Sequence, residues 1–379
     1  MNKRFPRKKI SGSYLVLGAG LIVVLTGFAV LAIDVGRILY IRNELQNVAD
    51  AAALAGANCL NRRSLAGSTT DCESGTSATL NWARATEKAT YQLGRNSADN
   101  FAISTTDLGH TVETGYWNLL SGTPSGGTLS TTFSPLTAND KPAIRVTVTK
   151  DTNKNNGPIK MLTATMFGGS DVPMTAQAVA VLSSPGMVLP SNVIPQVINK
   201  CMYDKYWDAN TGEPIKYKAG DINPFPEISQ TVGKEWELLI GSAYHYGTCT
   251  SGQWTSFLIP DESSKNIEKL IKTGNTSPMK IGDEVYVTNG SMTSNYKDIL
   301  AAYPSIKSGA GVDVAVIVVD DLVPGDLSSV VGFAGFHITA IDDKSGKYIQ
   351  GHFIKNYIAP GSGGIGPFFG TYTPPRLAQ

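Results

Sequence analysis

Histidines are the side chains of this 379-residue sequence with the plainest capacity for acid–base chemistry. The four histidines are His110, His245, His337 and His352. Nucleophilic catalysis usually needs such a base beside a serine or cysteine. His337 in GFHITA and His352 in QGHFI instead lie inside strand-like runs, where a histidine usually has a structural hydrogen bond. The sequence contains no GxSxG, Walker or HExxH pattern. We therefore expect no catalytic residue, and a hydrolase with an unrecognised site is the alternative.

Two acid pairs and the cysteines are the candidate metal ligands. Asp320-Asp321 and Asp342-Asp343 follow apolar strands, and either pair could bind a cation or act as paired carboxylates. Their spacing fits no EF-hand loop, so solvated strand ends are the expectation. The cysteines have no CxxC or CxxH spacing. We expect neither a metal site nor a cofactor.

The cysteines suit a disulfide framework instead. They form an even set, Cys59, Cys72, Cys201 and Cys249, as in proteins of oxidising compartments. Four cysteines allow three pairings. Proximity along the chain favours Cys59–Cys72 and Cys201–Cys249.

The N-terminal segment predicts a membrane span. Five basic residues come first: Lys3, Arg4, Arg7, Lys8 and Lys9. Residues 10–33 carry no charge, and as a helix they would extend about 36 Å, which matches a bilayer core. A cleaved signal peptide is the alternative, but its apolar region would be shorter and would end in a small-x-small site. The positive-inside rule keeps the basic tail in the cytoplasm and puts the rest of the chain on the periplasmic side of a bacterial inner membrane.

The helical pattern continues beyond the span. Apolar residues recur three or four positions apart from Val35 to Ala55, and no Gly-Pro break precedes Gly56. We expect one rod of about 45–50 residues, because nothing interrupts the 3.6-residue period. Small residues between Ala49 and Ala57 would let a neighbouring backbone approach closely. That neighbour is either a partner helix or the protein's own globular part.

The remaining patterns predict an α+β fold. A small α+β module, with a helix at 79–93 and strands at 111–117, 143–149 and 175–182, precedes a β-rich C-terminal domain. The predicted segments are a tail at 1–9, a transmembrane helix at 10–33, its periplasmic extension at 34–60, the module at 61–182, a linker at 183–190 and the C-terminal domain at 191–379. A net charge of +1 gives no global field to attract nucleic acid.

One stretch carries a family resemblance. The sequence GSYLVLGAGLIVVLTGFAVLAIDVGRILYIRNELQNVADAAALAGA resembles the N-terminal segment of TadG-like proteins of the tight-adherence (Flp, type IVc) pilus assembly system. Matching positions include Asp34, Gly36, Arg37, Tyr40, Leu45, Gln46 and the run from Ala49 to Ala57. The segments VETGYWN, NDKPAIRVTVTK and MFGGSDVPMTAQAVAV are similar to the module that follows in that family.

The sequence departs from family patterns at two places. Pilins of the system have a glutamate five residues after the glycine of a processing site, whereas counting from Gly12 reaches Leu17. We therefore expect the chain to stay uncleaved. Many TadG-like proteins also have a metal-binding Asp-x-Ser-x-Ser motif. The nearest candidate here is DESSK, in which Lys265 replaces the second serine and would repel a divalent metal.

The resemblance implies a role in pilus assembly or anchoring through protein contact, without catalysis. Its implied partners are other Tad/Flp proteins, pilins, a second copy of the chain and inner-membrane lipid. The rod and the resemblance together predict a helix interface at Gly12, Asp34, Gly36, Arg37, Leu45, Gln46, Asp50, Ala52, Ala55 and Gly56. Five tryptophans and 15 tyrosines support one alternative, a membrane-anchored ligand-binding module, since such residues often line binding faces.

Overall fold

The described chain divides into two contact-based units. The computed structural model describes residues 13–64, 72–76, 80–134, 136–209, 211–355, 357–364 and 366–378. The first unit comprises the chain up to residue 52 together with 90–112 and 146–178, and the second comprises 53–89, 113–145 and 179–379. The units interleave along the sequence, whereas the sequence patterns predicted consecutive segments. Those segment boundaries stay predictions.

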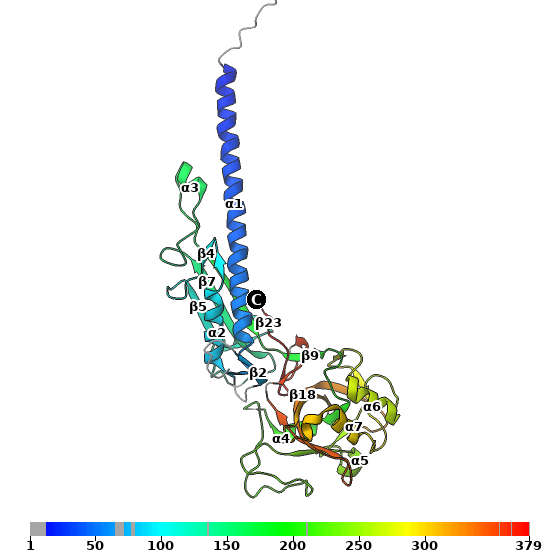
Figure 1. The fold of residues 1–379 in the computed structure, drawn as a ribbon. Coiled ribbons are helices and arrows are strands. Elements are labelled where there is room, and N and C mark those ends of the chain that lie inside the picture. Colours follow the sequence, from blue (N-terminus) through cyan, green and yellow to red (C-terminus); the bar gives the residue numbers. More distant parts are fainter. Residues whose placement is uncertain are drawn as a thin grey trace, which may run out of the picture. The chain divides into compact units, whose positions relative to one another are not determined.

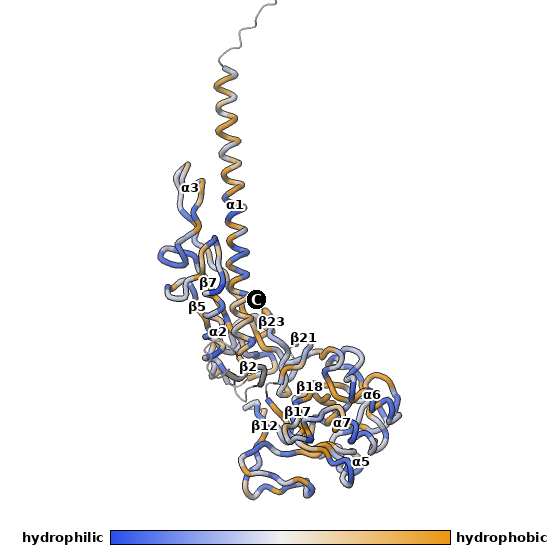
Figure 2. The backbone as a smooth tube through the Cα atoms, in the orientation of Figure 1, coloured by the Kyte–Doolittle hydropathy of each residue, from blue (hydrophilic) through white to orange (hydrophobic). Residues whose placement is uncertain are grey.

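Helix α1, Ser13–Ala57, is uninterrupted over 45 residues (Figure 1). At 1.5 Å per residue it is about 68 Å long. Figure 2 shows that the first part of α1 is almost wholly apolar and that polar residues begin near its middle. No charged residue interrupts α1 before Asp34. Within the described residues, α1 is long and apolar enough to cross a membrane.

The first unit contains a tight hairpin and a short helix besides most of α1. The hairpin joins β3, Ser97–Ala98, to β4, Phe101–Ala102. Its two central residues, Asp99 and Asn100, have φ of 55° and 64°, as a type I′ turn requires. The short helix is α3, Leu162–Phe167. It lies in a loop closed by paired backbone hydrogen bonds between Ile159 and Val172.

A five-stranded sheet carries the module that follows α1. Its strand order is β23-β8-β7-β5-β6. The strands are β5 His110–Asn118, β6 Thr123–Pro124, β7 Asp140–Lys150, β8 Met174–Val181 and β23 Arg376–Leu377. Helix α2, Trp82–Gly94, and a hairpin of β1, Arg62–Ser64, with β2, Cys72–Thr76, complete the module. Alternating apolar side chains on β7 are buried, as the pattern AIRVTVT predicts.

The C-terminal domain, within the second unit, is built on a seven-stranded sheet. Its order is β13-β19-β18-β17-β10-β14, and β16 also pairs with β18. The strands are β10 Gln196–Asn199, β13 Leu238–Ile240, β14 Gly252–Trp254, β16 Glu284–Tyr286, β17 Val312–Val319, β18 Leu327–Asp342 and β19 Tyr348–Ile354. Residues from Val314 to Val319 are buried, as their β-branched sequence predicts.

Short helices and small sheets surround this sheet. The helices are α4 Lys200–Tyr206, α5 Ala243–Tyr246, α6 Ser264–Thr273 and α7 Tyr296–Ala302. The small strands are β9 Ser184–Val188, β11 Trp207–Asp208, β12 Glu213–Pro214, β15 Met279–Lys280, β20 Tyr357–Ile358, β21 Gly361–Gly364 and β22 Thr371–Tyr372. With α1 and the module, they confirm the α+β class with a β-rich C-terminal domain.

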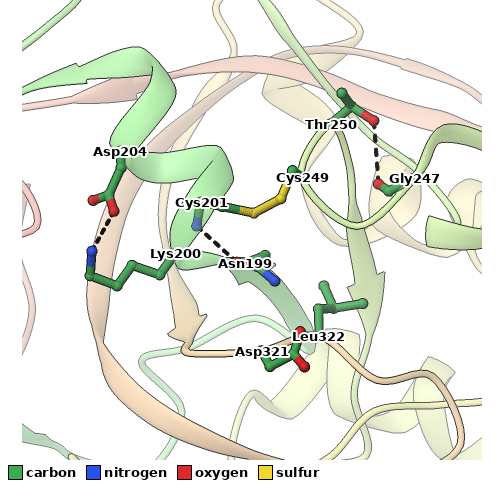
Figure 3. Close-up of a disulfide and its surroundings, with 9 residues drawn as sticks. All are labelled: Asn199, Lys200, Cys201, Asp204, Gly247, Cys249, Thr250, Asp321 and Leu322. Carbon is green, nitrogen blue, oxygen red and sulfur yellow. Dashed lines mark hydrogen bonds and ion pairs between the residues drawn. A yellow bond between two sulfur atoms is a disulfide. The ribbon is translucent and has the colours of Figure 1, made fainter.

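Two disulfides join the cysteines in the expected pairs. Cys59 pairs with Cys72, and their Cα atoms are 5.7 Å apart. Cys201 pairs with Cys249 across 48 residues, with Cα atoms 5.4 Å apart. Figure 3 shows that Cys201 lies in the first turn of α4, where the Asn199 side chain accepts a hydrogen bond from its backbone N–H at 2.8 Å. The Cys201–Cys249 disulfide therefore connects the capped N-terminal turn of α4 to the segment before β14.

The segment expected to be a linker, residues 183–190, contains a strand, and its role as a linker stays a prediction. Ser184–Val188 forms β9, the middle strand of a three-stranded sheet with β15 and β21. Pro185 and Gly186 suggested a turn, but the Gly186 backbone lies against Gly364, where an added Cβ would be 3.5 Å from the Gly364 Cα. A Cβ at that distance would make ordinary van der Waals contact, and Gly186 takes part in strand β9 instead of a turn.

Candidate functional site

Asp34 is a buried carboxylate directly after the most exposed part of α1. It directly follows the uncharged run, whose large apolar side chains are exposed from Tyr14 to Ile33. Its Oδ1 accepts a hydrogen bond from the Leu162 backbone N–H at 2.9 Å. Its Oδ2 accepts from the Thr163 N–H at 2.8 Å and from the Thr163 hydroxyl at 2.6 Å. Asp34, the first charged residue after the apolar run, therefore forms hydrogen bonds with Thr163 of the same chain, 129 residues away.

These contacts cap helix α3. The first N–H groups of a helix have no partner inside it, and Met161, the residue before α3, supplies no side-chain cap. The Asp34 carboxylate replaces that cap and also meets the positive end of the helix dipole. The Thr163 hydroxyl and the two backbone N–H groups therefore hold the pKa of Asp34 below its ordinary value, against the opposing effect of burial.

Arg37 makes a second contact to the same unit. Its guanidinium donates to the Lys160 carbonyl oxygen and to the Asp99 carboxylate, both at 3.0 Å. Asp99 reaches Arg37 because the type I′ turn of the β3–β4 hairpin presents its side chain. The Asp99 backbone N–H in turn donates to Glu44 on α1 at 2.8 Å. Asp34, Arg37 and Glu44 thus fix one face of the helix.

Lys150 completes this cluster. Its ammonium is 3.8 Å from the Asp99 carboxylate and donates to the Asn155 carbonyl oxygen at 2.9 Å. Burial lowers the pKa of Lys150, and the Asp99 charge partly opposes that shift. We call this set of Asp34, Arg37, Glu44, Asp99, Lys150, Lys160 and Thr163 the collar. Sequence reasoning selected only Asp34 and Arg37 from it.

Farther along α1, the predicted interface residues lie inward. Leu45 and Ala52 are buried, whereas Ala55 is half-buried. The Gln46 amide donates to Asp50 at 2.8 Å and to the Gln177 carbonyl oxygen at 3.0 Å.

Gly56 has no free space beside it. A Cβ added there would be 2.7 Å from the Ile144 side chain, 2.8 Å from the Ala85 carbonyl oxygen and 2.9 Å from the Ala89 Cβ. At Gly56, the small-residue side of α1 therefore packs against α2 and β7 of the same chain. This favours the protein's own globular part, and not a partner helix, as the neighbour at this position.

Gly36 contrasts with Gly56. It is exposed, and an added Cβ would meet nothing within 4 Å. Val35, Leu39 and Tyr40 on the same stretch are also exposed. We call these four residues the open face. Gly12, also predicted for the interface, lies outside the described residues.

The histidines selected for chemistry are held by carboxylates. His337 Nδ1 is 2.6 Å from an Asp313 oxygen, and His352 Nδ1 is 2.9 Å from a Glu237 oxygen. The bond to Asp313 raises the pKa of His337, partly opposed by burial. Glu237 also accepts from Thr339 at 2.7 Å and from Gln350 at 3.0 Å. Both rings thus have the satisfied hydrogen bonds expected of structural histidines.

The other candidate ligands do not form a cluster. The Asp261 carboxylate of DESSK accepts a hydrogen bond from the Ser263 backbone N–H at 2.9 Å, just before α6. The Asp342 carboxylate stabilises the turn between β18 and β19 by accepting hydrogen bonds from the backbone N–H groups of Lys344 and Ser345. Among the described residues, no three His, Cys, Asp or Glu side chains lie together as metal ligands would.

A cavity of about 420 Å³ lies in the second unit. Aromatic side chains line it, among them Tyr116, Tyr203, Trp207 and Phe369. The buried Tyr203 hydroxyl has no hydrogen-bond partner among the described residues. Lys141, also in the lining, donates to the Ser184 hydroxyl at 2.8 Å, and burial lowers its pKa to about 8.

Fold and collar together define a class of protein. A long apolar helix that could cross a membrane is fastened, directly after its apolar run, to a module of its own chain. Residues 12–58 match the family model described as putative Flp pilus-assembly TadE/G-like, and residues 64–180 match that described as putative Tad-like Flp pilus-assembly. Over these residues the chain is similar to Tad-like Flp pilus-assembly proteins, which supports a role in Flp pilus assembly. No curated protein and no solved structure matches the chain.

Proposed function

We propose that this protein is an inner-membrane anchor for Flp pilus assembly whose bulk lies in the periplasm. Residues 10–33 cross the bilayer once, and the collar fixes the module beside the point where α1 leaves the lipid. The observation that carries this proposal is the change in burial along α1. Its apolar side chains are exposed up to Ile33, and the buried, hydrogen-bonded Asp34 follows at once.

The open face is the proposed contact for another assembly component. Val35, Leu39 and Tyr40 expose roughly half or more of their surface, and Gly36 lies between them. Val35 and Leu39 are four residues apart, as are Gly36 and Tyr40, so the two pairs lie along one side of the helix. A glycine there permits close helix approach. The proposed occupant is the apolar side of a helix from another Tad protein.

A matched pair of glycine substitutions tests this function. Gly36→Leu should abolish surface pili and co-purification of assembly partners while leaving protein abundance unchanged, since the new side chain meets nothing in its own chain. Gly36→Ala should retain most of both. Normal piliation with Gly36→Leu would show that the open face is not the contact.

We further propose that the protein acts by contact and not by turnover. The bonds from His337 and His352 to carboxylates support a structural role for both histidines. The double substitution of both by Gln should leave piliation unchanged in cells that contain normal amounts of the protein. A loss of piliation at normal abundance would favour the hydrolase alternative.

A ligand-binding role for the C-terminal domain is a second candidate, favoured by the aromatic cavity and the unpartnered Tyr203 hydroxyl. Its volume lies in the range of small-molecule sites. Glycans or short peptides that bind there should quench the fluorescence of Trp207, and the Trp207→Phe variant should lose that component. Screens with no such difference would count against this role.

A further inference from the structure

The loop that contains α3 exposes apolar side chains. We call residues 160–171 the finger; the paired Ile159 and Val172 close its base. Leu162 is 44% exposed and Met166 is 56% exposed, one helical turn apart on α3. A single exposed apolar side chain is ordinary, but these two lie on adjacent turns of one short helix and together form a small exposed apolar patch.

The collar sets the position of the finger along α1. Asp34 binds the first two residues of α3, and Arg37 binds the Lys160 carbonyl oxygen immediately before it. Figure 1 shows α3 at the far end of a long extension, beside the middle of α1. The first turn of α3 is therefore held at the residue where the uncharged run of α1 ends.

The charges nearby suit a lipid headgroup region. Lys160 is exposed on the finger, and its ammonium pairs with Asp171 at the finger's other end. Arg37 is only partly covered. Cationic side chains with apolar stems often sit at the membrane surface, where the stem contacts lipid and the charge stays hydrated.

We propose that α3 inserts shallowly into the outer leaflet of the membrane that α1 crosses. This inference rests on the proposed membrane span. The finger then gives the module a second lipid contact, and because Asp34 joins both contacts, the module cannot rotate freely about α1. Leu162 and Met166 are the side chains that enter the lipid.

Site-specific quenching by lipid tests the proposal in the full-length protein. All four native cysteines are in disulfides, so a single added cysteine can be labelled with an environment-sensitive fluorophore. The variants are Met166→Cys, Leu25→Cys in the span and Leu108→Cys, which is 85% exposed in the same unit. Each is placed in lipid nanodiscs that contain no other protein, with quenchers at shallow or deep positions of the acyl chain.

We expect shallow quenchers to reduce the Met166 signal several-fold more than the Leu108 signal, because interfacial helices lie near the headgroup boundary. Deep quenchers should act most strongly on Leu25. Leu162→Cys should behave as Met166→Cys does, and serves if that variant folds poorly. Met166 and Leu162 signals that match Leu108, with Leu25 quenched, would overturn the finger proposal alone. An unquenched Leu25 would overturn the span and the finger together.

Discussion

Two stretches of α1 contain similar apolar residues that differ in burial. From Tyr14 to Ile33 its large apolar side chains are exposed, whereas Ile41, Leu45 and Val48 are almost fully buried by the chain itself. The collar lies between these stretches. The comparison indicates that the first stretch needs an apolar environment from outside the chain, while the second is already packed. Mutations in the first stretch should therefore impair membrane insertion, whereas mutations in the second should destabilise the folded protein.

A charge in the first stretch should have the largest effect. Leu25→Arg should impair membrane insertion, because an arginine at the centre of a spanning helix costs about 2.5–3.5 kcal/mol on insertion scales. Extraction of membranes at alkaline pH measures the inserted fraction. Leu108→Arg, at an exposed site outside α1, is the matched control and should insert normally. Equal extraction of both variants would contradict the lipid assignment.

Crowding at Gly56 should come next. Gly56→Leu should destabilise the folded module by roughly 1–3 kcal/mol, since the side chain would overlap the Ala85 carbonyl oxygen and the Ile144 side chain. Denaturant unfolding of the full-length protein measures this. Gly36→Leu is the control on the same helix and should change stability by less than about 0.5 kcal/mol. Equal losses at both glycines would remove the contrast between packed and open faces.

Loss of the Asp34 carboxylate should have a moderate effect. Asp34→Ala should cost about 1–2 kcal/mol, as for other helix caps whose backbone donors lose their acceptor. Hydrogen exchange at the Leu162 and Thr163 amides should then accelerate. Exchange unchanged from the parent protein would show that the collar does not hold α3.

The same carboxylate predicts a pH dependence. Because folding lowers the pKa of Asp34, its stabilisation is fully present above the ordinary aspartate pKa of about 3.9 and is lost as pH falls through the lower, folded value. Hydrogen exchange at Thr163 should therefore accelerate only in strong acid. Asp34→Asn should lack this acid transition, and a transition retained in that variant would assign it to another group.

Removal of Arg37 should have the smallest effect. Its pair with Asp99 is partly solvated, so Arg37→Ala should cost roughly 0–1 kcal/mol. Denaturant unfolding at low and high salt measures the change, which should shrink as salt screens the pair. A large, salt-independent loss would mean that packing of the Arg37 stem dominates.

Sequence patterns predicted the long elements because their signals are local. The uncharged run and the periodic residues after it indicated α1 as one helix, and alternation in AIRVTVT indicated β7. Short chain separations also favoured the two disulfides that form. Helices α4 and α7 were missed, since seven residues give little periodicity and α4 starts from a single Asn199 cap.

The collar could be predicted only in part. Asp34 and Arg37 stand out in the sequence, but their partners Thr163 and Asp99 are 129 and 62 residues away, and no local pattern encodes such contacts. The Asp99-Asn100 turn was a usable signal, since both residues favour the positive φ of a two-residue hairpin. That signal would have located the hairpin but not its contact with Arg37.

Topology in intact cells tests the central claim most directly. A cysteine at Leu108 should react with a membrane-impermeant maleimide in spheroplasts, whereas a cysteine replacing Lys3 in the basic tail should react only after the inner membrane is permeabilised. This result would support one crossing by α1 with the module on the periplasmic side. Labelling of Lys3→Cys in sealed spheroplasts, or protection of Leu108→Cys, would contradict the account.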